Sequence, residues 1–248
     1  MPKFFVPKEN ISEDKILICG DDVAHIKRVL RLGVGDTLCL CDGAGTNYDA
    51  KISQINEKDI ICQISSKQKA DTEPDISVTL YQGLPKASKM DYIIQKTTEL
   101  GIVKIVPTVM SRCVVKIDNQ KDAQKKQQRW QKISEEAAKQ SGRGIIPEVA
   151  EPMDFYKAIE EMKKADIAFA PYECEEDGKL KTVLTKKQNI KSISFIIGPE
   201  GGFDLTEVEK LRENGIDTIT LGKRILRTET AGEAVLSMIM YECGDINK

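Results

Sequence analysis

The strongest constraint on the fold of this chain is a regular alternation of apolar strands and amphipathic helices after residue 74. Apolar stretches such as "ISVTLYQG" and "ISFIIGPEGG" each precede a segment in which apolar residues recur at helical spacing. Such alternation is typical of β-α units on a mostly parallel sheet. The sequence therefore predicts an α/β domain.

The first 70 residues have a different pattern. Short stretches in which apolar and polar residues alternate, such as "DTLCLCDG" and "DIICQISS", are separated by Gly, Asn and Asp. This pattern is typical of the strands of a small barrel or sandwich. The polar segment "KQKADTEPD" lies between the two patterns. We therefore expect two domains, residues 1–70 and residues 74–248.

Composition limits the possible functions. The 248 residues are 40% hydrophobic, which is enough for a sizeable core, and no stretch approaches the ~18 apolar residues of a membrane-spanning helix. The N-terminal segment lacks the apolar region of a secretory signal, so we expect a cytoplasmic protein without a membrane partner. The net charge of −2 means that any contact with nucleic acid needs a local basic patch. His25 is the only histidine, so catalytic triads and multi-histidine metal sites are hard to build, and we expect no metal.

Two basic segments are candidates for contact with phosphates. In "DDVAHIKRVLRLGVGD" a helix ending near Gly33 would present His25, Arg28 and Arg31 on one side, and arginine binds phosphate oxygens in a bidentate manner. A long helix expected at 122–141 ends in "SGRG", which would place Arg143 on a loop. The alternatives are a solvated helix face and an ordinary helix end.

Exposed backbone follows two strands near the C-terminus. In "FIIGPEGGF", Pro199 forces the chain out of the strand, and Gly201 and Gly202 allow a ligand to approach the backbone. A helix with a capping box of Asp204 and Glu207 is predicted to follow. Neither G-x-G-x-x-G nor G-x-x-x-x-G-K-[ST] is present, so nucleotide phosphates are not the expected ligand. A plain tight turn is the alternative.

The next strand, "IDTITLG", has the same arrangement. It leads into Gly222, a short loop through Arg227, and a helix for which Thr230 and Glu233 predict a second capping box. The apolar face of this helix is either core, the simpler interpretation, or a subunit contact. It consists of Ala231, Ala234, Val235, Met238 and Ile239.

These segments carry a resemblance to a known family. "IIGPEGGF", followed by "LGKRILRTETA", resembles the signature pair of the RsmE family of ribosomal RNA uridine methyltransferases, in the SPOUT superfamily. "HIKRVLRLGVGD", "QKTTELGI" and "EEAAKQSGR" match further segments of that family, in the same order along the chain. The resemblance covers nearly the whole sequence.

The resemblance implies a fold and an activity. The fold would be a small N-terminal PUA-like β-barrel domain that binds RNA, joined to a C-terminal SPOUT methyltransferase domain of the α/β class with a trefoil knot. Knots are rare, so that expectation rests on the resemblance alone. The protein would be a homodimer that uses S-adenosylmethionine to methylate ring nitrogen 3 (N3) of a specific uridine in small-subunit (16S) ribosomal RNA.

The resemblance also implies a set of site residues. Arg227, and after it Arg143, would neutralise charge on the uracil oxygens, and Glu229 or Glu200 would accept the proton. RNA would contact His25, Arg28, Arg31 and Arg143. Matching positions give a cofactor pocket formed by Pro171, Gly198, Pro199, Glu200, Gly201, Gly202, Leu221, Gly222, Ile225, Leu226, Arg227, Thr228 and Ala231.

Two other classes of function stay open. The chain could be a non-catalytic RNA-binding module, although such a module does not require two glycine loops. It could also be a dinucleotide-binding oxidoreductase, although the dinucleotide fingerprint is missing.

Overall fold

The computed structural model describes residues 3–117 and 119–246, which form two compact units. The first unit contains the chain up to Glu73 together with Ala138–Ile146. The second contains Pro74–Ala137 and the chain from Pro147 onwards. Nothing in the sequence pattern indicated that a segment near residue 140 belongs with the N-terminal strands.

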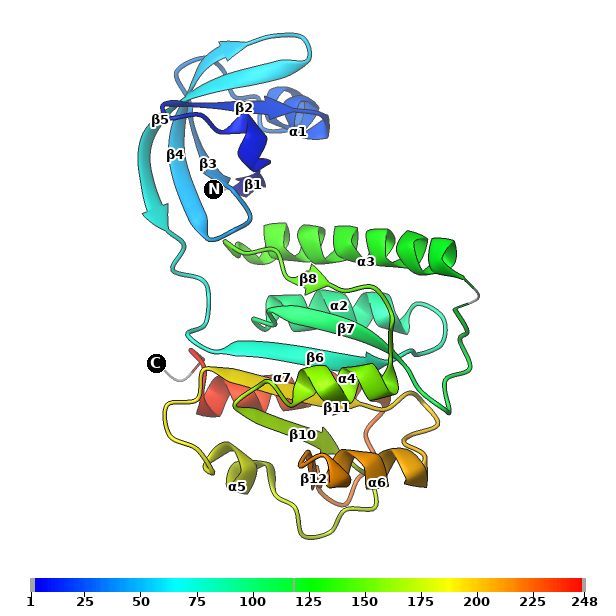
Figure 1. The fold of residues 1–248 in the computed structure, drawn as a ribbon. Coiled ribbons are helices and arrows are strands. Elements are labelled where there is room, and N and C mark those ends of the chain that lie inside the picture. The colour runs from blue at the N-terminus through cyan, green and yellow to red at the C-terminus, as the bar shows by residue number, and fades with distance from the viewer. Residues whose placement is uncertain (1–2, 118, 247–248) are drawn as a thin grey trace. The chain divides into compact units, whose positions relative to one another are not determined.

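The first unit is built on a five-stranded sheet with the order β1-β3-β4-β5-β2 (Figure 1). Only the β1–β3 pair is parallel. Apolar residues alternate along the strands, and Ile16, Leu40 and Ile52 point into a common core. The strands are β1 (Lys3–Phe5), β2 (Lys15–Cys19), β3 (Thr37–Cys41), β4 (Thr46–Ile55) and β5 (Asp59–Lys69).

Helical segments of the first unit are short. A 3-10 helix, η1 (Lys8–Asn10), follows β1. The single helix predicted to end near Gly33 is instead α1 (Asp21–Ala24) followed by a π-helix, η2 (His25–Val29). Arg31 then adopts a left-handed conformation with φ of 55°. Val23 and Ile26 still face the core, so the predicted apolar side was right although the helix geometry was not.

The second unit contains a seven-stranded sheet with the order β12-β10-β11-β6-β7-β8, and β9 pairs with β7. Every strand pair of this sheet is parallel, which confirms the predicted sheet type. Its strands are β6 (Ser77–Gly83), β7 (Lys104–Val109), β8 (Glu148–Val149), β9 (Met153–Asp154), β10 (Ile167–Pro171), β11 (Ser192–Ile197) and β12 (Asp217–Ile219).

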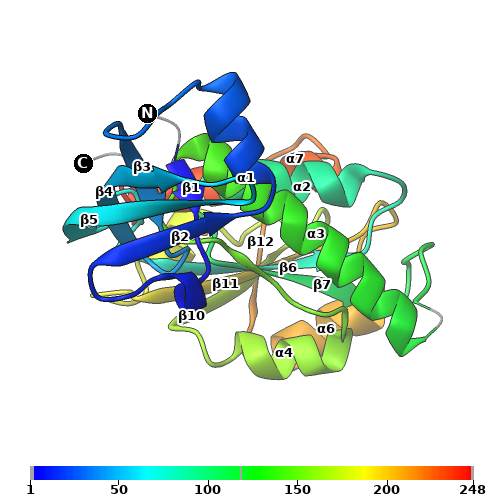
Figure 2. The same cartoon turned by 90° about the horizontal axis from the view of Figure 1, so that it is seen from above.

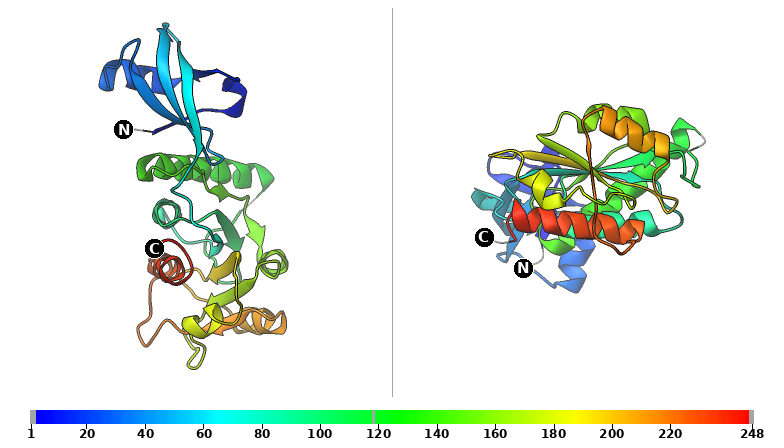
Figure 3. Two further views of the ribbon diagram at one scale, coloured as in Figure 1. Left: turned by 90° about the vertical axis from the view of Figure 1, so that its left-hand side faces the viewer. Right: turned by 90° about the horizontal axis from the view of Figure 1, so that it is seen from below.

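Helices cover both faces of this sheet. Figure 2 shows α4 (Phe155–Met162) and α6 (Leu205–Glu213) on one side, with α2 (Lys89–Glu99) and α7 (Thr228–Glu242) on the other. The view from below in Figure 3 shows the same separation of α6 from α7. The long helix α3 (Gln120–Ser141), which contributes Trp130, and the short α5 (Leu180–Leu184) join the α2 and α7 side.

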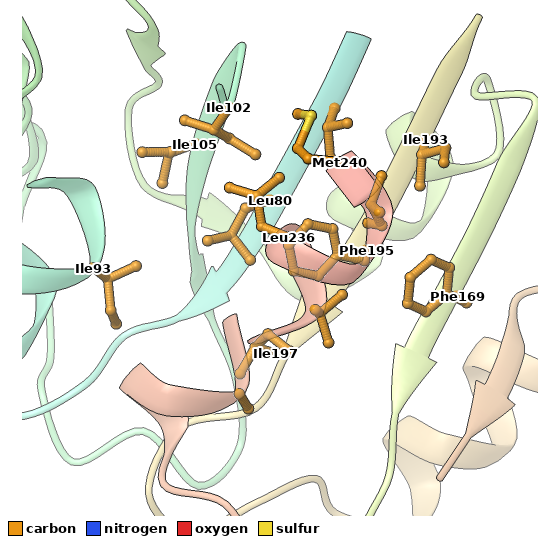
Figure 4. Packing of buried hydrophobic residues seen from close by; sticks show 14 of the residues in the cluster. Leu80, Ile93, Ile102, Ile105, Phe169, Ile193, Phe195, Ile197, Leu236 and Met240 are labelled. Carbon is orange, nitrogen blue, oxygen red and sulfur yellow. The ribbon is translucent and has the colours of Figure 1, made fainter. Parts of the chain in front are cut away.

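The larger core lies under α7. Figure 4 shows Leu236 and Met240 of α7 packed against Leu80 of β6 and Phe195 of β11. The rings of Phe169 and Phe195 stack with their centroids 5.9 Å apart. Strands buried on both faces need continuous apolar runs, which explains the sequence "ISFII" in β11.

Two expectations for α7 are corrected by the structure. The helix begins at Thr228, with Arg227 as an N-cap that makes no side-chain capping hydrogen bond, so Thr230 and Glu233 form no capping box. The residues of the predicted apolar face also differ in burial. Ala231, Val235 and Ile239 are buried in the core of the same chain, whereas Met238 is 41% exposed.

A buried ion pair closes the first unit around residues 138–146. Glu73 Oε1 accepts hydrogen bonds from the backbone N–H groups of Gly144 at 2.8 Å and Ile145 at 3.1 Å. Glu73 Oε2 accepts from Arg143 Nη2 at 2.6 Å, and the two side chains are only 11% and 4% exposed. Arg143, which was expected on a loop, is therefore buried against Glu73, a residue of the polar segment "KQKADTEPD".

We predict that Glu73→Gln strongly destabilises the first unit. The amide cannot balance the buried Arg143 charge, and breaking such a pair by removing one partner costs about 3 kcal/mol or more. Native-state hydrogen exchange of the amides in strands β2 and β5 should report an opening free energy that is lower than that of wild type by that amount. Glu57→Gln, at an exposed carboxylate in the same unit, serves as the control and should change little.

The destabilisation should also depend on pH. Burial raises the pKa of Glu73, but the hydrogen bond and charge of Arg143 outweigh it and hold the pKa below its usual value. A carboxyl with a lowered folded-state pKa stabilises the fold above its unfolded-state pKa, and this contribution is lost as the pH falls through the folded-state value. The difference between wild type and Glu73→Gln should therefore shrink in acid, and a constant difference would contradict the assignment.

Candidate functional site

A cavity of about 870 Å³ lies in the second unit, at the carboxyl ends of β10, β11 and β12. Its volume falls within the roughly 300–1,000 Å³ of small-molecule sites. The carboxyl edge of a parallel sheet is also where ligands of α/β folds bind. The predicted cofactor residues that line it are Pro171, Gly198, Pro199, Glu200, Gly202, Leu221, Gly222, Ile225, Leu226, Arg227, Thr228 and Ala231.

Gly201 is the predicted cofactor residue that does not line the cavity. It faces the other way, where a Cβ atom would lie 3.0 Å from Arg112 Cβ. Arg112 also donates from Nη1 to the Gly201 carbonyl at 3.0 Å. Gly201 therefore packs against Arg112 and does not face the cavity, while Gly202, with φ of +66°, makes the turn.

The loop after β11 is held rigidly at both ends. Gly202 N–H donates to the Pro199 carbonyl at 2.9 Å, closing a tight turn. The capping box predicted for α6 is present, because the Asp204 side chain accepts from the Glu207 backbone N–H and Asp204 N–H donates to Glu207 Oε2. The backbone that follows β11 is therefore preorganised by its own sequence.

The loop after β12 leaves its backbone accessible. Gly222 adopts φ of +94°, and its N–H donates to Thr220 Oγ1 at 3.1 Å. Within the described part of the chain, the backbone N–H groups of residues 223–226 donate no hydrogen bond. Ile225 is 81% exposed although it borders the cavity. Amides and apolar surface are thus presented together, as recognition of a heteroaromatic ligand requires.

A buried hydrogen-bond chain joins the two loops. Thr228 Oγ1 donates to the Gly198 carbonyl at 2.7 Å and accepts from Gln82 Nε2 at 2.9 Å. Gln82 is fully buried and Thr228 nearly so. Sequence analysis did not identify Gln82, and the only signal was a polar residue inside the apolar run "VTLYQGL".

Lys89 also lines the cavity and was not predicted. Its Nζ lies 3.1 Å from Glu200 Oε1 and 3.3 Å from Glu229 Oε2. Glu200 accepts in addition from the Lys86 backbone N–H at 3.0 Å. The two glutamates expected as candidate bases are therefore partners of one lysine, and Glu229 is not among the residues that line the cavity.

An acidic segment after β10 borders the cavity on another side. Glu175 accepts from the Thr218 hydroxyl, from Gly178 N–H and from Arg212 Nη2. These contacts, led by the Thr218 hydrogen bond, lower the pKa of Glu175 to about 2. Glu175 is thus engaged in holding β12 and the 173–178 segment in place.

The expected RNA contacts lie in the first unit. His25, Arg28 and Arg31 are all exposed on the α1–η2 segment, and the His25 ring stands edge-on to Phe4 with centroids 5.8 Å apart. Arg143 is buried against Glu73 and is not part of this surface.

Among the described residues, no group of three His, Cys, Asp or Glu side chains could hold a metal ion. None of the helices in this part of the chain has the length and apolar character of a membrane span.

Two family models match the chain. A model described as an RNA methyltransferase domain matches residues 72–240, and one described as an RNA methyltransferase PUA domain matches residues 18–65. Ribosomal RNA small subunit methyltransferase E of Bacillus subtilis (strain 168) is 35% identical over 249 residues, which cover 98% of this chain and 97% of that protein. The protein of the same name from Mesomycoplasma hyopneumoniae is 33% identical and covers 96% of this chain and 98% of its own.

Solved structures agree with these matches. Ribosomal RNA small subunit methyltransferase E from Neisseria gonorrhoeae, bound to S-adenosylmethionine, is 30% identical, with a TM-score of 0.87 and 99% coverage of both chains. A Legionella pneumophila protein in complex with the same cofactor is 28% identical, with a TM-score of 0.86 and 99% coverage of both chains. The predicted fold class, a SPOUT α/β domain with an N-terminal PUA domain, is confirmed, and the trefoil knot stays a prediction. The chain belongs to the RNA methyltransferase family of ribosomal RNA small subunit methyltransferase E.

Proposed function

We propose that this protein transfers the methyl group of S-adenosylmethionine to N3 of one uridine in small-subunit (16S) ribosomal RNA, in the cytoplasm. The cavity at the carboxyl ends of β10, β11 and β12 carries the proposal, because it combines accessible backbone with apolar side chains and lacks a phosphate-binding motif. The names and bound cofactor of the relatives support it. Residues 1–70 would bind RNA, and residues 74–248 would perform the transfer.

The residues of the cavity fit this cofactor. S-adenosylmethionine has no phosphates, so it needs neither an anion-binding nest nor a metal. The amides of residues 223–226 can meet the adenine edge, while Leu221, Ile225 and Leu226 supply apolar contact. When bound, the cofactor supplies an activated methyl group on a sulfonium that carries its own leaving group.

The protein's task is then placement and charge stabilisation. Holding the reacting atoms in line supplies much of the barrier reduction. Arg227, exposed at the cavity and at the start of α7, would neutralise charge on the uracil oxygens. Glu229 is our candidate for receiving the proton, although it is paired with Lys89. Arg143 could take part only if its pair with Glu73 opened.

Calorimetry separates this function from the two alternatives. We expect S-adenosylmethionine to bind and NAD to give no heat. Binding of NAD would favour an oxidoreductase, and binding of neither ligand would favour a non-catalytic RNA-binding module.

We predict that Gly222→Ala weakens binding of S-adenosylmethionine by at least about 10-fold, because φ of +94° disfavours any side chain and the loop would change conformation. Gly215→Ala is the matched control. Gly215 has φ of +75° and, like Gly222, no atom within 4 Å of the point that a Cβ would occupy, but it lies outside the cavity lining. Calorimetry showing equal affinities for both variants would contradict the assignment of the loop.

For RNA, we predict that replacing Arg28 and Arg31 together with Ala lowers the slope of log affinity against log salt by roughly one to two units. Both side chains are exposed beside His25, so their loss should remove phosphate contacts without disturbing the core. Affinity for S-adenosylmethionine should not change. Replacing the exposed Lys15 and Lys58 of the same unit is the control, and an equal effect there would indicate nonspecific attraction.

We also propose a homodimer with the outer face of α7 at its interface. Exposed Met238, Tyr241 and Ile246 line an apolar groove together with Leu180 and Leu184. The groove lies at the C-terminal end of α7, and the first residues of the same helix border the cavity, so one helix connects the two. Assembly and activity should therefore be coupled.

Met238→Asp should convert the dimer to a folded monomer, because a charge buried at the interface without a partner costs on the order of 3 kcal/mol. Since Met238 is 41% exposed in the single chain, the variant should stay folded. Leu205→Asp, at a 65% exposed position on α6, should leave assembly unchanged. Sedimentation of wild type as a monomer at micromolar concentration would refute the dimer.

A further inference from the structure

Lys89 differs from the other cations that line the cavity. Lys223, Arg224 and Arg227 are exposed on the segment that follows β12, whereas Lys89 is the first residue of α2. Side chains on helices are held more firmly than those on loops. One positive charge is therefore fixed in the cavity wall by regular secondary structure.

Two carboxylates hold the ammonium group of Lys89. Its Nζ lies 3.1 Å from Glu200 Oε1 and 3.3 Å from Glu229 Oε2. An ammonium has three N–H donors, and these are its two ion pairs within the described chain. The side chain is 31% exposed and borders the cavity. At least one donor therefore remains for a ligand.

The partners of Lys89 belong to the two elements that form the cavity. Glu200 lies in the glycine loop after β11, and Glu229 lies in the first turn of α7. The ammonium is thus positioned before any substrate arrives. A donor that needs no reorganisation is the kind that stabilises a transition state effectively.

Lys89 is a cation at physiological pH. The hydrogen bond to Glu200, and with it the pairing to Glu229, raises the pKa of Lys89 above its usual value. Lys89 can therefore donate a hydrogen bond but cannot serve as the base. Its charge also remains constant through the pH range in which uracil begins to ionise.

Methylation at N3 of uracil creates negative charge beside the reacting atom. N3 loses its proton to water or a carboxylate, its electron pair forms the bond to the methyl carbon, and the C–S electron pair stays on sulfur. As the proton leaves, charge spreads to the ring oxygens O2 and O4 on either side of N3. A fixed N–H donor at one of these oxygens lowers the barrier.

We propose that Lys89 is a catalytic residue that donates its remaining N–H to a uracil oxygen and stabilises this charge. The assignment rests on the proposed function. It adds a second candidate for charge stabilisation to Arg227, in the role for which Arg143 had been the next choice. Arg143 is engaged with Glu73 in the first unit.

The competing role for Lys89 is purely structural: its ion pairs would only hold the glycine loop against α7. The two roles differ in what a variant would lose. If Lys89 has a structural role, its loss should weaken binding of the cofactor. If Lys89 stabilises charge, its loss should matter only when the uracil loses its proton. The acidity of the uracil therefore distinguishes them.

The test compares wild type, Lys89→Met, Lys89→Arg and Lys96→Met. Lys96 is the matched control, since it is paired with Glu99 on the same helix and lies outside the cavity lining. Single-turnover transfer is measured on small-subunit RNA containing uridine or 5-fluorouridine, whose N3 proton is more acidic. Calorimetry gives the affinity of each variant for S-adenosylmethionine.

We expect Lys89→Met to slow transfer to uridine RNA by about 100-fold, with cofactor affinity within about twofold of wild type. The defect should shrink on 5-fluorouridine RNA and at higher pH, and Lys89→Arg should recover part of the rate. An equal defect on both RNAs, or a parallel loss of cofactor affinity, would overturn the proposal. If wild type formed no N3-methyluridine at all, the proposed function would fail first, and the role of Lys89 with it.

Discussion

Thr228 joins the two loops that form the cavity, because its hydroxyl donates to the Gly198 carbonyl and accepts from Gln82. Three segments far apart in the sequence meet at this hydroxyl: the end of β6, the loop after β11 and the start of α7. All three groups are buried or nearly so, and a buried polar group without its partner costs about 1–3 kcal/mol. The relative position of the two loops is therefore strongly determined.

The path of the chain explains why backbone is left accessible here. β12 lies at the edge of the sheet, yet the next element, α7, packs on the central strands β6 and β11. The segment between them must therefore return from the edge across the carboxyl ends of the strands. It makes no strand pairing on the way, apart from the bridge of Thr220 to Lys179. The unpaired amides that result are the ones we assign to the cofactor.

Local sequence patterns predicted much of this architecture. Alternating apolar segments predicted the parallel sheet, and Asp204 with Glu207 predicted the start of α6, because a capping box depends only on residues close in sequence. Gly198 and Gly222 were assigned to the cavity by their matching positions in the family, and Gly222 adopts φ of +94°. The start of α7 was misplaced because Thr228 uses its hydroxyl for a tertiary contact, and no local pattern reveals that choice. Gln82, Lys89 and the burial of Arg143 escaped prediction for the same reason, since each depends on a partner distant in the sequence.

The central claim is methylation of N3 of a uridine in small-subunit ribosomal RNA, and analysis of the product tests it most directly. Unmodified small-subunit RNA or subunits would be incubated with the protein and with S-adenosylmethionine carrying a deuterated methyl group. The nucleosides released by digestion would then be separated and identified by mass spectrometry. We predict one labelled nucleoside, N3-methyluridine, at a single position. Label on a ribose or on another base, or no label with a protein shown to bind the cofactor, would contradict the account.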